Sequence, residues 1–129
     1  MGGGRGGNYG TGAGSAKAQL QVTFRRVAEA FPLSKSGKFG SASKVSGVRL
    51  ITSNDPAATA ERFFRLASKD ATRVHIVRDG VTRASFGDGS HVIWRPRSHS
   101  DGSPVVELNL VTRVSGLSGH QKIHFVKES

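Results

Sequence analysis

Residues 73–95 read RVHIVRDGVTRASFGDGSHVIWR, and this stretch decides the fold class. Asp79-Gly80 and Asp88-Gly89 divide it, and Asp-Gly pairs favour the positive φ values of tight hairpin turns. Apolar and polar residues alternate in the three segments between the turns, as in strands with one buried face. These segments are Arg73–Arg78, Thr82–Phe86 and His91–Arg95. The stretch therefore predicts a meandering antiparallel sheet.

The same pattern continues toward the C-terminus. Val105–Leu110 and Gln121–Val126 are predicted as strands, and Asp101-Gly102 supplies a third turn signal. Val48–Ile51 can add one short strand upstream. The sequence thus predicts a sheet of four or five antiparallel strands.

Two helices are predicted before the sheet. In Ala18–Phe31 the apolar residues recur at steps of four, three and four, which places them on one helical face, and Pro32 ends the pattern. A second helix is predicted from Pro56 to about Ala67, because Ser53-Asn54-Asp55 offers capping side chains ahead of a proline at the first helical position. The expected fold is α+β, with N-terminal helices packed on the antiparallel sheet.

The remaining segments are predicted as connectors. Residues 1–16 are rich in glycine and are interpreted as a flexible tether, with a glycine-arginine RNA-binding segment as the alternative, so that residues 17–129 form the single domain. Leu33–Gly47 is predicted as a loop. Its Lys35, Lys38 and Lys44 suit either a solvated connector or a loop that contacts phosphate.

The charge balance favours an anionic partner. The chain has 19 Lys+Arg against 9 Asp+Glu, a formal net charge of +10, which suits a nucleic acid. No apolar run approaches the ~20 residues of a membrane span. The absence of cysteine excludes disulfides, thiolate catalysis and thiolate zinc sites, including those of zinc-dependent base deaminases.

RNA cleavage fits this composition without a metal or another cofactor. An RNA phosphodiester already contains its nucleophile, the neighbouring 2′-hydroxyl, so an enzyme needs only a base, an acid and cations. A two-metal nuclease would need clustered carboxylates. Asp79, Asp88 and Asp101 each precede a glycine and are interpreted as turn residues.

The last predicted strand offers the best catalytic candidates. Period-two geometry puts Lys122 and His124 on one face and Ile123 and Phe125 on the other. His124 could exchange protons near neutral pH while Lys122 holds a phosphate oxygen. The alternative is an ordinary half-exposed strand.

Further candidates lie around the other strands. Arg95 could grip a phosphate with two parallel hydrogen bonds, Ser98 could donate to the same phosphate, and His75 is a second candidate for proton transfer. Trp94 is interpreted as a packed side chain. The residues predicted to contact the substrate outside the catalytic group are Arg78, Arg97, His99 and His120, the last in an expected loop.

Several of these segments, taken in order, resemble a known class of proteins. They are Asn54-Asp55-Pro56 with Ala60–Phe64, Asp88-Gly89-Ser90 with Trp94–Ser98, Asp101–Asn109, and Gln121–Phe125. Together they are similar to the C-terminal nuclease modules of bacterial polymorphic and contact-dependent growth-inhibition toxins, over roughly Val48 to Val126. Those modules are similar to the fold group of barnase, EndoU, the tRNA-cleaving colicins and RelE. The EndoU pattern of two histidines and a lysine is not met at recognisable spacing.

The resemblance implies a fold and a function. It implies helices on a four-stranded sheet whose open face cuts RNA, with Arg95, Ser98, Lys122 and His124 lining the site. It implies a monomeric endoribonuclease, acting on tRNA, that a longer secreted effector delivers into the cytoplasm of a target bacterium and that a cognate immunity protein blocks. A non-catalytic RNA-binding module and a metal-dependent DNase toxin remain the alternatives.

Overall fold

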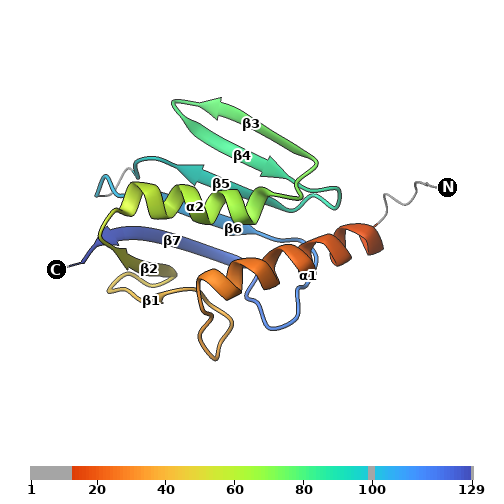
Figure 1. Ribbon diagram of the computed structural model, residues 1–129, viewed down its shortest axis with the longest axis horizontal. Coiled ribbons are helices and arrows are strands. Elements are labelled where there is room, and N and C mark those ends of the chain that lie inside the picture. Colours follow the sequence, from red (N-terminus) through yellow and green to blue (C-terminus); the bar gives the residue numbers. More distant parts are fainter. Residues whose placement is uncertain (1–12, 99–100, 129) are drawn as a thin grey trace.

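The structure, a computed structural model, describes residues 13–98 and 101–128 and contains two helices and a seven-stranded sheet. Helices α1 (Ala13–Ala30) and α2 (Pro56–Ser68) lie on one face of the sheet (Figure 1). The strands are β1 (Ser41–Ala42), β2 (Val48–Ser53), β3 (Arg73–Arg78), β4 (Val81–Ser85), β5 (His91–Arg95), β6 (Val105–Asn109) and β7 (His120–Lys127). The α+β class is as predicted, but the sheet is larger than the expected four or five strands.

The additional strands of the sheet, β1 and β2, lie beyond β7 at one edge. The order is β1-β2-β7-β6-β5-β4-β3, in which β3 to β7 form the predicted antiparallel meander. β2 pairs in parallel with β7, and Val48 lies beside Lys122. The prediction of a purely antiparallel sheet was therefore wrong at this edge. A parallel pair joins segments distant in the chain, so no local turn signal announces it.

The three Asp-Gly pairs occupy turns, as predicted. Asp79 and Gly80 both have positive φ, 44° and 77°, in the β3–β4 hairpin. Gly89, between β4 and β5, and Gly102, between β5 and β6, have φ of 94° and 77°. Such values are strained for most side chains, so the turns depend on these residues.

Three of the differences from the predicted boundaries change how a segment is interpreted. Helix α1 begins at Ala13, inside the segment interpreted as a tether, since alanine favours helix and Ala16 is buried. Residues 1–12 lie outside the described residues. Strand β1 lies within the predicted loop 33–47, where it pairs with β2. His120 starts β7 instead of lying in a loop, because it pairs with Asn109 of β6.

The apolar core lies between the helices and one face of the sheet. Phe63 of α2 packs against Phe31, Phe39 and Phe125, with ring centroids 5.0–5.7 Å apart. Trp94 packs on Phe64, which confirms the packed interpretation of the tryptophan. Neither helix of the described part is long and apolar enough to cross a membrane.

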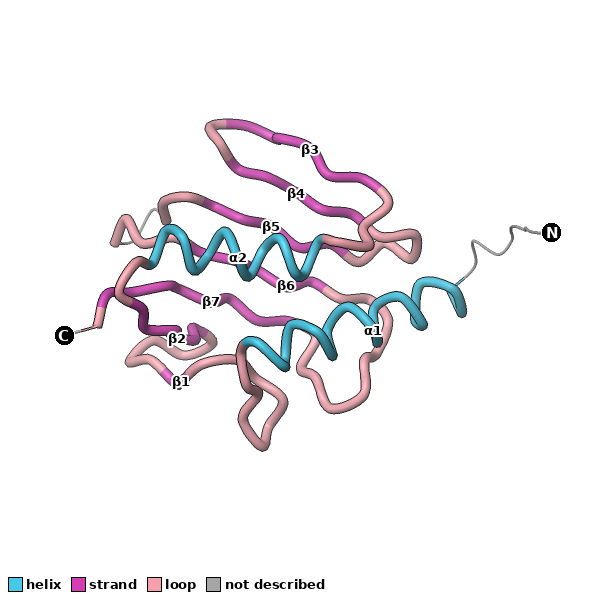
Figure 2. The backbone as a smooth tube through the Cα atoms, in the orientation of Figure 1, coloured by secondary structure: helices cyan, strands magenta, loops and turns pink. Residues whose placement is uncertain are grey.

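The helices leave part of the sheet uncovered. Figure 2 shows both helices on the same side, with the β3–β4 hairpin extending beyond them. Val74 and Ile76 of β3 are consequently exposed although they alternate with His75 as predicted. Within residues 13–98 and 101–128, no helix covers the opposite face of the sheet, so its side chains are left for other contacts.

Candidate active site

The helix-free face of the sheet gathers basic and imidazole side chains. Because Ala84, Val92, Leu108 and Ile123 are buried in the core, the residues that alternate with them point to the opposite face. Strand register aligns these residues into three rows across the strands. The rows are His75, Arg83, Ile93, Glu107 and Lys122; Arg73, Ser85, His91, Asn109 and His120; and Arg95, Val105, His124 and Leu50.

His124 occupies a built environment on this face. Only 4% of the residue is exposed, yet it does not belong to the apolar cluster under the helices. Ser103 and Asp101, from the turn between β5 and β6, lie against its ring. On the other side, the β1–β2 loop contributes Ser43, Lys44 and Val45 to a cavity that His124 also lines. Loops, and not the core, therefore bury this imidazole.

A hydrogen-bonded chain fixes the His124 ring. Ser103 Oγ lies 2.8 Å from His124 Nδ1 and 2.6 Å from Asp101 Oδ1. An ionised carboxylate accepts only, so Ser103 donates its single proton to Asp101 and accepts one from Nδ1–H of His124. Nε2 has no hydrogen-bond partner among residues 13–98 and 101–128. The chain thus assigns the proton of the neutral ring to Nδ1 and leaves Nε2 to exchange protons.

Asp101 is held as a carboxylate by its donors. Its pKa lies far below the ordinary value because the hydroxyls of Ser103 and Ser98 and the backbone N–H of Ser103 all donate to it. Its Oδ1 also lies 3.5 Å from His124 Nδ1. A permanent negative charge at this position stabilises the imidazolium that forms when Nε2 takes a proton.

The cavity beside His124 places two lysines near the imidazole. We call it the His124 cavity; it has a volume of about 420 Å³. Lys122 comes from the same strand and Lys44 from the β1–β2 loop, and both can offer ammonium protons to an anion. The remaining lining residues are Ser43, Val45, Val48, Leu50 and Asp101. An imidazole and two cations at one opening are suited to an anionic ester.

Two predicted phosphate ligands are engaged elsewhere. Arg95 Nε donates to Glu107 Oε2 over 2.8 Å, and Arg95 lies two strands from His124, about 10 Å away at ~4.8 Å per strand. Ser98 Oγ donates to Asp101 Oδ1 over 2.6 Å. Both therefore border the site through a carboxylate and do not line the cavity.

The other predicted residues are spread over the molecule. His75 is in the row of Lys122 but four strands away, about 19 Å, so the two cannot hold one phosphate. Arg78 ends β3 at the far edge of the sheet. Arg97 is exposed in the loop after β5, and His99 lies outside the described residues. His120 shares a strand with His124, about 13 Å away at ~3.3 Å per residue.

Sequence reasoning missed three members of the site. Asp101 was interpreted only as a turn residue and Ser103 was given no role, whereas both orient His124. Glu107, the partner of Arg95, was not considered. The only sequence signal for Asp101 and Ser103 was the turn that contains them, and a turn signal does not reveal that β7 passes beside it. Lys44 was considered as a phosphate contact, and the structure places it at the cavity.

No group of three or more His, Asp or Glu in the described residues could hold a metal ion. No protein-family model, curated protein or solved structure matches the chain. Functional interpretation therefore depends on the geometry of the site and on the resemblance noted in the sequence.

Proposed function

We propose that the chain is a metal-independent endoribonuclease whose active site is the His124 cavity. The observation behind this proposal is the imidazole whose Nδ1–H is held by Ser103 and Asp101, in a cavity shared with Lys122 and Lys44. A net charge of +10 favours a polyanionic substrate. The helix-free face, with its arginines and histidines, gives room for the strand that flanks the scissile bond.

The proposed reaction is a transesterification. Nε2 of His124 takes the proton of the 2′-hydroxyl, whose oxygen then attacks the adjacent phosphorus. The P–O5′ bond breaks, leaving a 2′,3′-cyclic phosphate, and the 5′-oxygen takes a proton from water to leave as a 5′-hydroxyl, while His124 returns its proton to the solvent. Lys122 and Lys44 stabilise the charge that accumulates on the phosphoryl oxygens in the transition state.

Arg95 has a supporting role in this scheme. Its guanidinium neutralises Glu107, which lies opposite Lys122 in the register. Without that pairing, the carboxylate would compete with the substrate phosphate for the ammonium group of Lys122. Arg95 thus keeps Lys122 available for the substrate.

Substitution of His124 tests the proposal. Purified chain is incubated with total tRNA in EDTA, and the ends of the products are identified. His124→Ala should lower the cleavage rate by about 10²–10⁴-fold, the usual contribution of general acid–base catalysis, while RNA affinity stays within a few-fold. His75→Ala is the matched control, since His75 lies on the same face far from the cavity.

The other outcomes distinguish the alternatives. RNA that stays intact at high concentrations of the wild-type chain, together with binding that weakens gradually as basic residues are removed, would indicate a non-catalytic RNA-binding module. Cleavage only after addition of Mg²⁺ would indicate a metal-dependent nuclease. Equal losses in His75→Ala and His124→Ala would remove the His124 cavity as the active site.

The biological role follows from the resemblance to toxin modules. We propose that the domain acts as a monomer on tRNA in the cytoplasm of a target bacterium, after delivery by a larger secreted effector. A cognate immunity protein would then inhibit the domain by covering the basic residues of the helix-free face with an acidic surface of its own, which is electrostatically complementary. Expression of the domain, with and without the His124→Ala substitution, measures the effect on growth.

A further inference from the structure

A second cavity adjoins the His124 cavity and has a different chemistry. We call it the Arg49 cavity; it has a volume of about 230 Å³ and lies where β2 and β7 begin. This is below the ~300–1,000 Å³ of sites for drug-sized ligands, so it suits one small group. No carboxylate is among its lining residues, which are Lys38, Ala42, Ser43, Val45, Ser46, Gly47, Val48, Arg49, His120 and Gln121.

Arg49 is fixed in position at this cavity. Its Nε donates to the carbonyl of Phe39 and one terminal nitrogen to the carbonyl of Gly40, both over 2.9 Å. Gly40 has φ of 64°, and a Cβ there would lie 2.1 Å from the carbonyl oxygen of Leu50. The turn that anchors the guanidinium thus admits only glycine. A pre-oriented guanidinium loses little entropy when it binds an anion.

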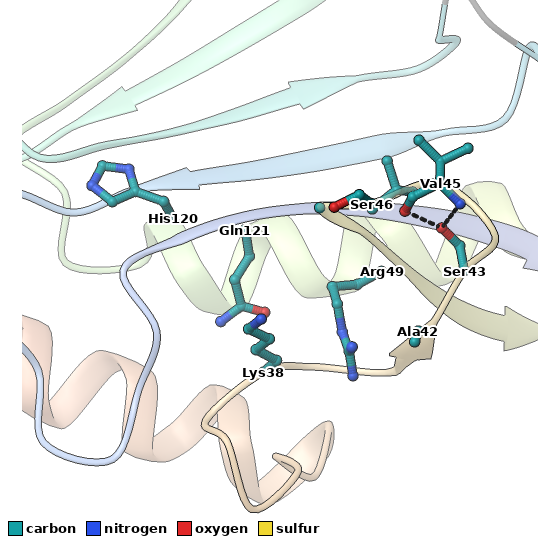
Figure 3. Close-up of a pocket in the computed structure, with 10 residues that line it drawn as sticks. Lys38, Ala42, Ser43, Val45, Ser46, Arg49, His120 and Gln121 are labelled. Atoms are coloured by element: carbon teal, nitrogen blue, oxygen red, sulfur yellow. Dashed lines mark hydrogen bonds between the residues drawn. The ribbon is translucent and has the colours of Figure 1, made fainter.

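Other donors complete the cavity. Lys38 is exposed and contributes a mobile ammonium group. Figure 3 shows Lys38, Arg49 and Gln121 together on one side of the β2–β7 pair, with His120 apart from them along β7. The Gln121 amide is already bonded to Phe39, Gly37 and Ser118, so it shapes the wall and does not compete for a ligand. A cavity that is lined by cations and hydroxyls and has no carboxylate among its lining residues favours an anionic ligand.

The two cavities share a wall. Ser43, Val45 and Val48 line both, and Lys122 lies between His120 and His124 on β7. The shared loop is held by hydrogen bonds between Ser43 and Val45, drawn in Figure 3, and by Val48 N donating to Val45 O. Arg49 pairs with the buried Ile123 and His124 pairs with Leu50, so the two side chains point to opposite faces of the sheet and the shared loop lies between them. An extended polyanion bound at His124 would therefore turn around this loop to reach Arg49.

We propose that the Arg49 cavity binds a backbone phosphate of RNA next to the phosphodiester held in the His124 cavity. This inference rests on the proposed ribonuclease function. Lys38 and Arg49 would grip the neighbouring phosphate and set the register of the strand, because phosphate contacts position a nucleic acid. A free phosphate ion has the same chemistry, so the experiment must separate the two sources.

Binding to a non-cleaving protein provides the test. The full chain with His124→Ala is titrated with a short single-stranded RNA, alone and combined with Lys38→Ala. Loss of one charge-assisted contact should raise Kd about tenfold. Lys35→Ala is the matched control, since Lys35 belongs to the same exposed loop but does not line the cavity, and it should change Kd less than about twofold.

Inorganic phosphate identifies the source of the anion. Phosphate should shift the NMR signals of the Arg49 side chain and His120, and RNA should displace it. If phosphate binds there but RNA does not displace it, the cavity takes a free anion and the inference is wrong. Equal effects of Lys35→Ala and Lys38→Ala, or no phosphate shift at Arg49, also overturn it.

These results are independent of cleavage. If RNA binding depends on Lys38 but the wild-type chain cuts no RNA, the phosphate site in the Arg49 cavity is supported and the ribonuclease proposal is wrong. If RNA is cut but Lys38→Ala and Lys35→Ala change RNA binding equally, the ribonuclease proposal is supported and the phosphate site in the Arg49 cavity is wrong.

Discussion

At the scale of single residues, the position of one proton determines what His124 can do. Ser103 accepts from Nδ1–H only because Asp101 takes the serine proton. Asp101 remains charged because several donors lower its pKa. Removing the serine hydroxyl would therefore leave the imidazole in place with only the more distant Asp101 carboxylate, 3.5 Å from Nδ1, to orient its proton.

Ser103→Ala tests this positioning role. We expect kcat for RNA cleavage to fall by about 10–100-fold, less than in His124→Ala, because the imidazole is retained but poorly oriented. KM should stay the same, since Ser103 does not line the cavity. Ser103→Thr retains a hydroxyl and should restore most of the rate. A change in KM with kcat unaffected, or a Ser103→Thr variant as slow as Ser103→Ala, would contradict the assignment.

At the scale of elements, turns between strands depend on carboxylates. Asp88 accepts from the backbone and hydroxyl of Ser90 over 2.8 and 2.9 Å and from the Thr112 hydroxyl. It thereby joins the β4–β5 turn to the segment that follows β6. Burial raises its pKa, but the hydrogen bonds from Thr112 and Ser90 outweigh this, and the net pKa lies below 3.8. Folding consequently favours the charged form.

The pH dependence of stability should reveal this turn. Because the folded pKa of Asp88 is lowered, its contribution is complete above the unfolded value of 3.8 and is lost as pH falls through the folded pKa. Asp88→Asn should lower Tm at pH 7, and its difference from wild type should shrink below about pH 4. Thermal unfolding followed by circular dichroism measures this. Asp79→Asn, in the exposed β3–β4 turn, is the control; a pH-independent difference for Asp88→Asn would contradict the prediction.

At the scale of the whole molecule, the two faces of the sheet have different roles. One face packs on α1 and α2 and provides the core. The other presents basic side chains from β3 to β7, among them Arg73, Arg83 and Lys122. Because these residues share one face, a single RNA can contact several of them, and each contact releases counterions from the nucleic acid.

Salt dependence distinguishes the two faces. In the His124→Ala background, Arg83→Ala should reduce the slope of log K against log salt by about 0.7 for single-stranded RNA, the value of one phosphate contact. Arg25→Ala removes the same charge from α1, on the helical side, and should leave the slope nearly unchanged. Fluorescence anisotropy at several salt concentrations gives both slopes. Equal reductions would show that binding follows net charge and not the helix-free face.

The sequence by itself determined the local structure. Alternation and Asp-Gly pairs gave the meander from β3 to β7, and capping residues with apolar periodicity gave the two helices. It also placed Lys122 and His124 on one face of β7, because side-chain alternation is a property of the strand alone. These features depend on contacts between near neighbours in the chain.

Only the tertiary structure decided which distant groups meet. The parallel pairing of β2 with β7 brings Lys44 to His124, and the β5–β6 turn brings Asp101 and Ser103 to the same ring. It also separates His75 from the site and pairs Arg95 with Glu107. Such contacts depend on strand order and register, which side-chain pattern within one segment does not specify.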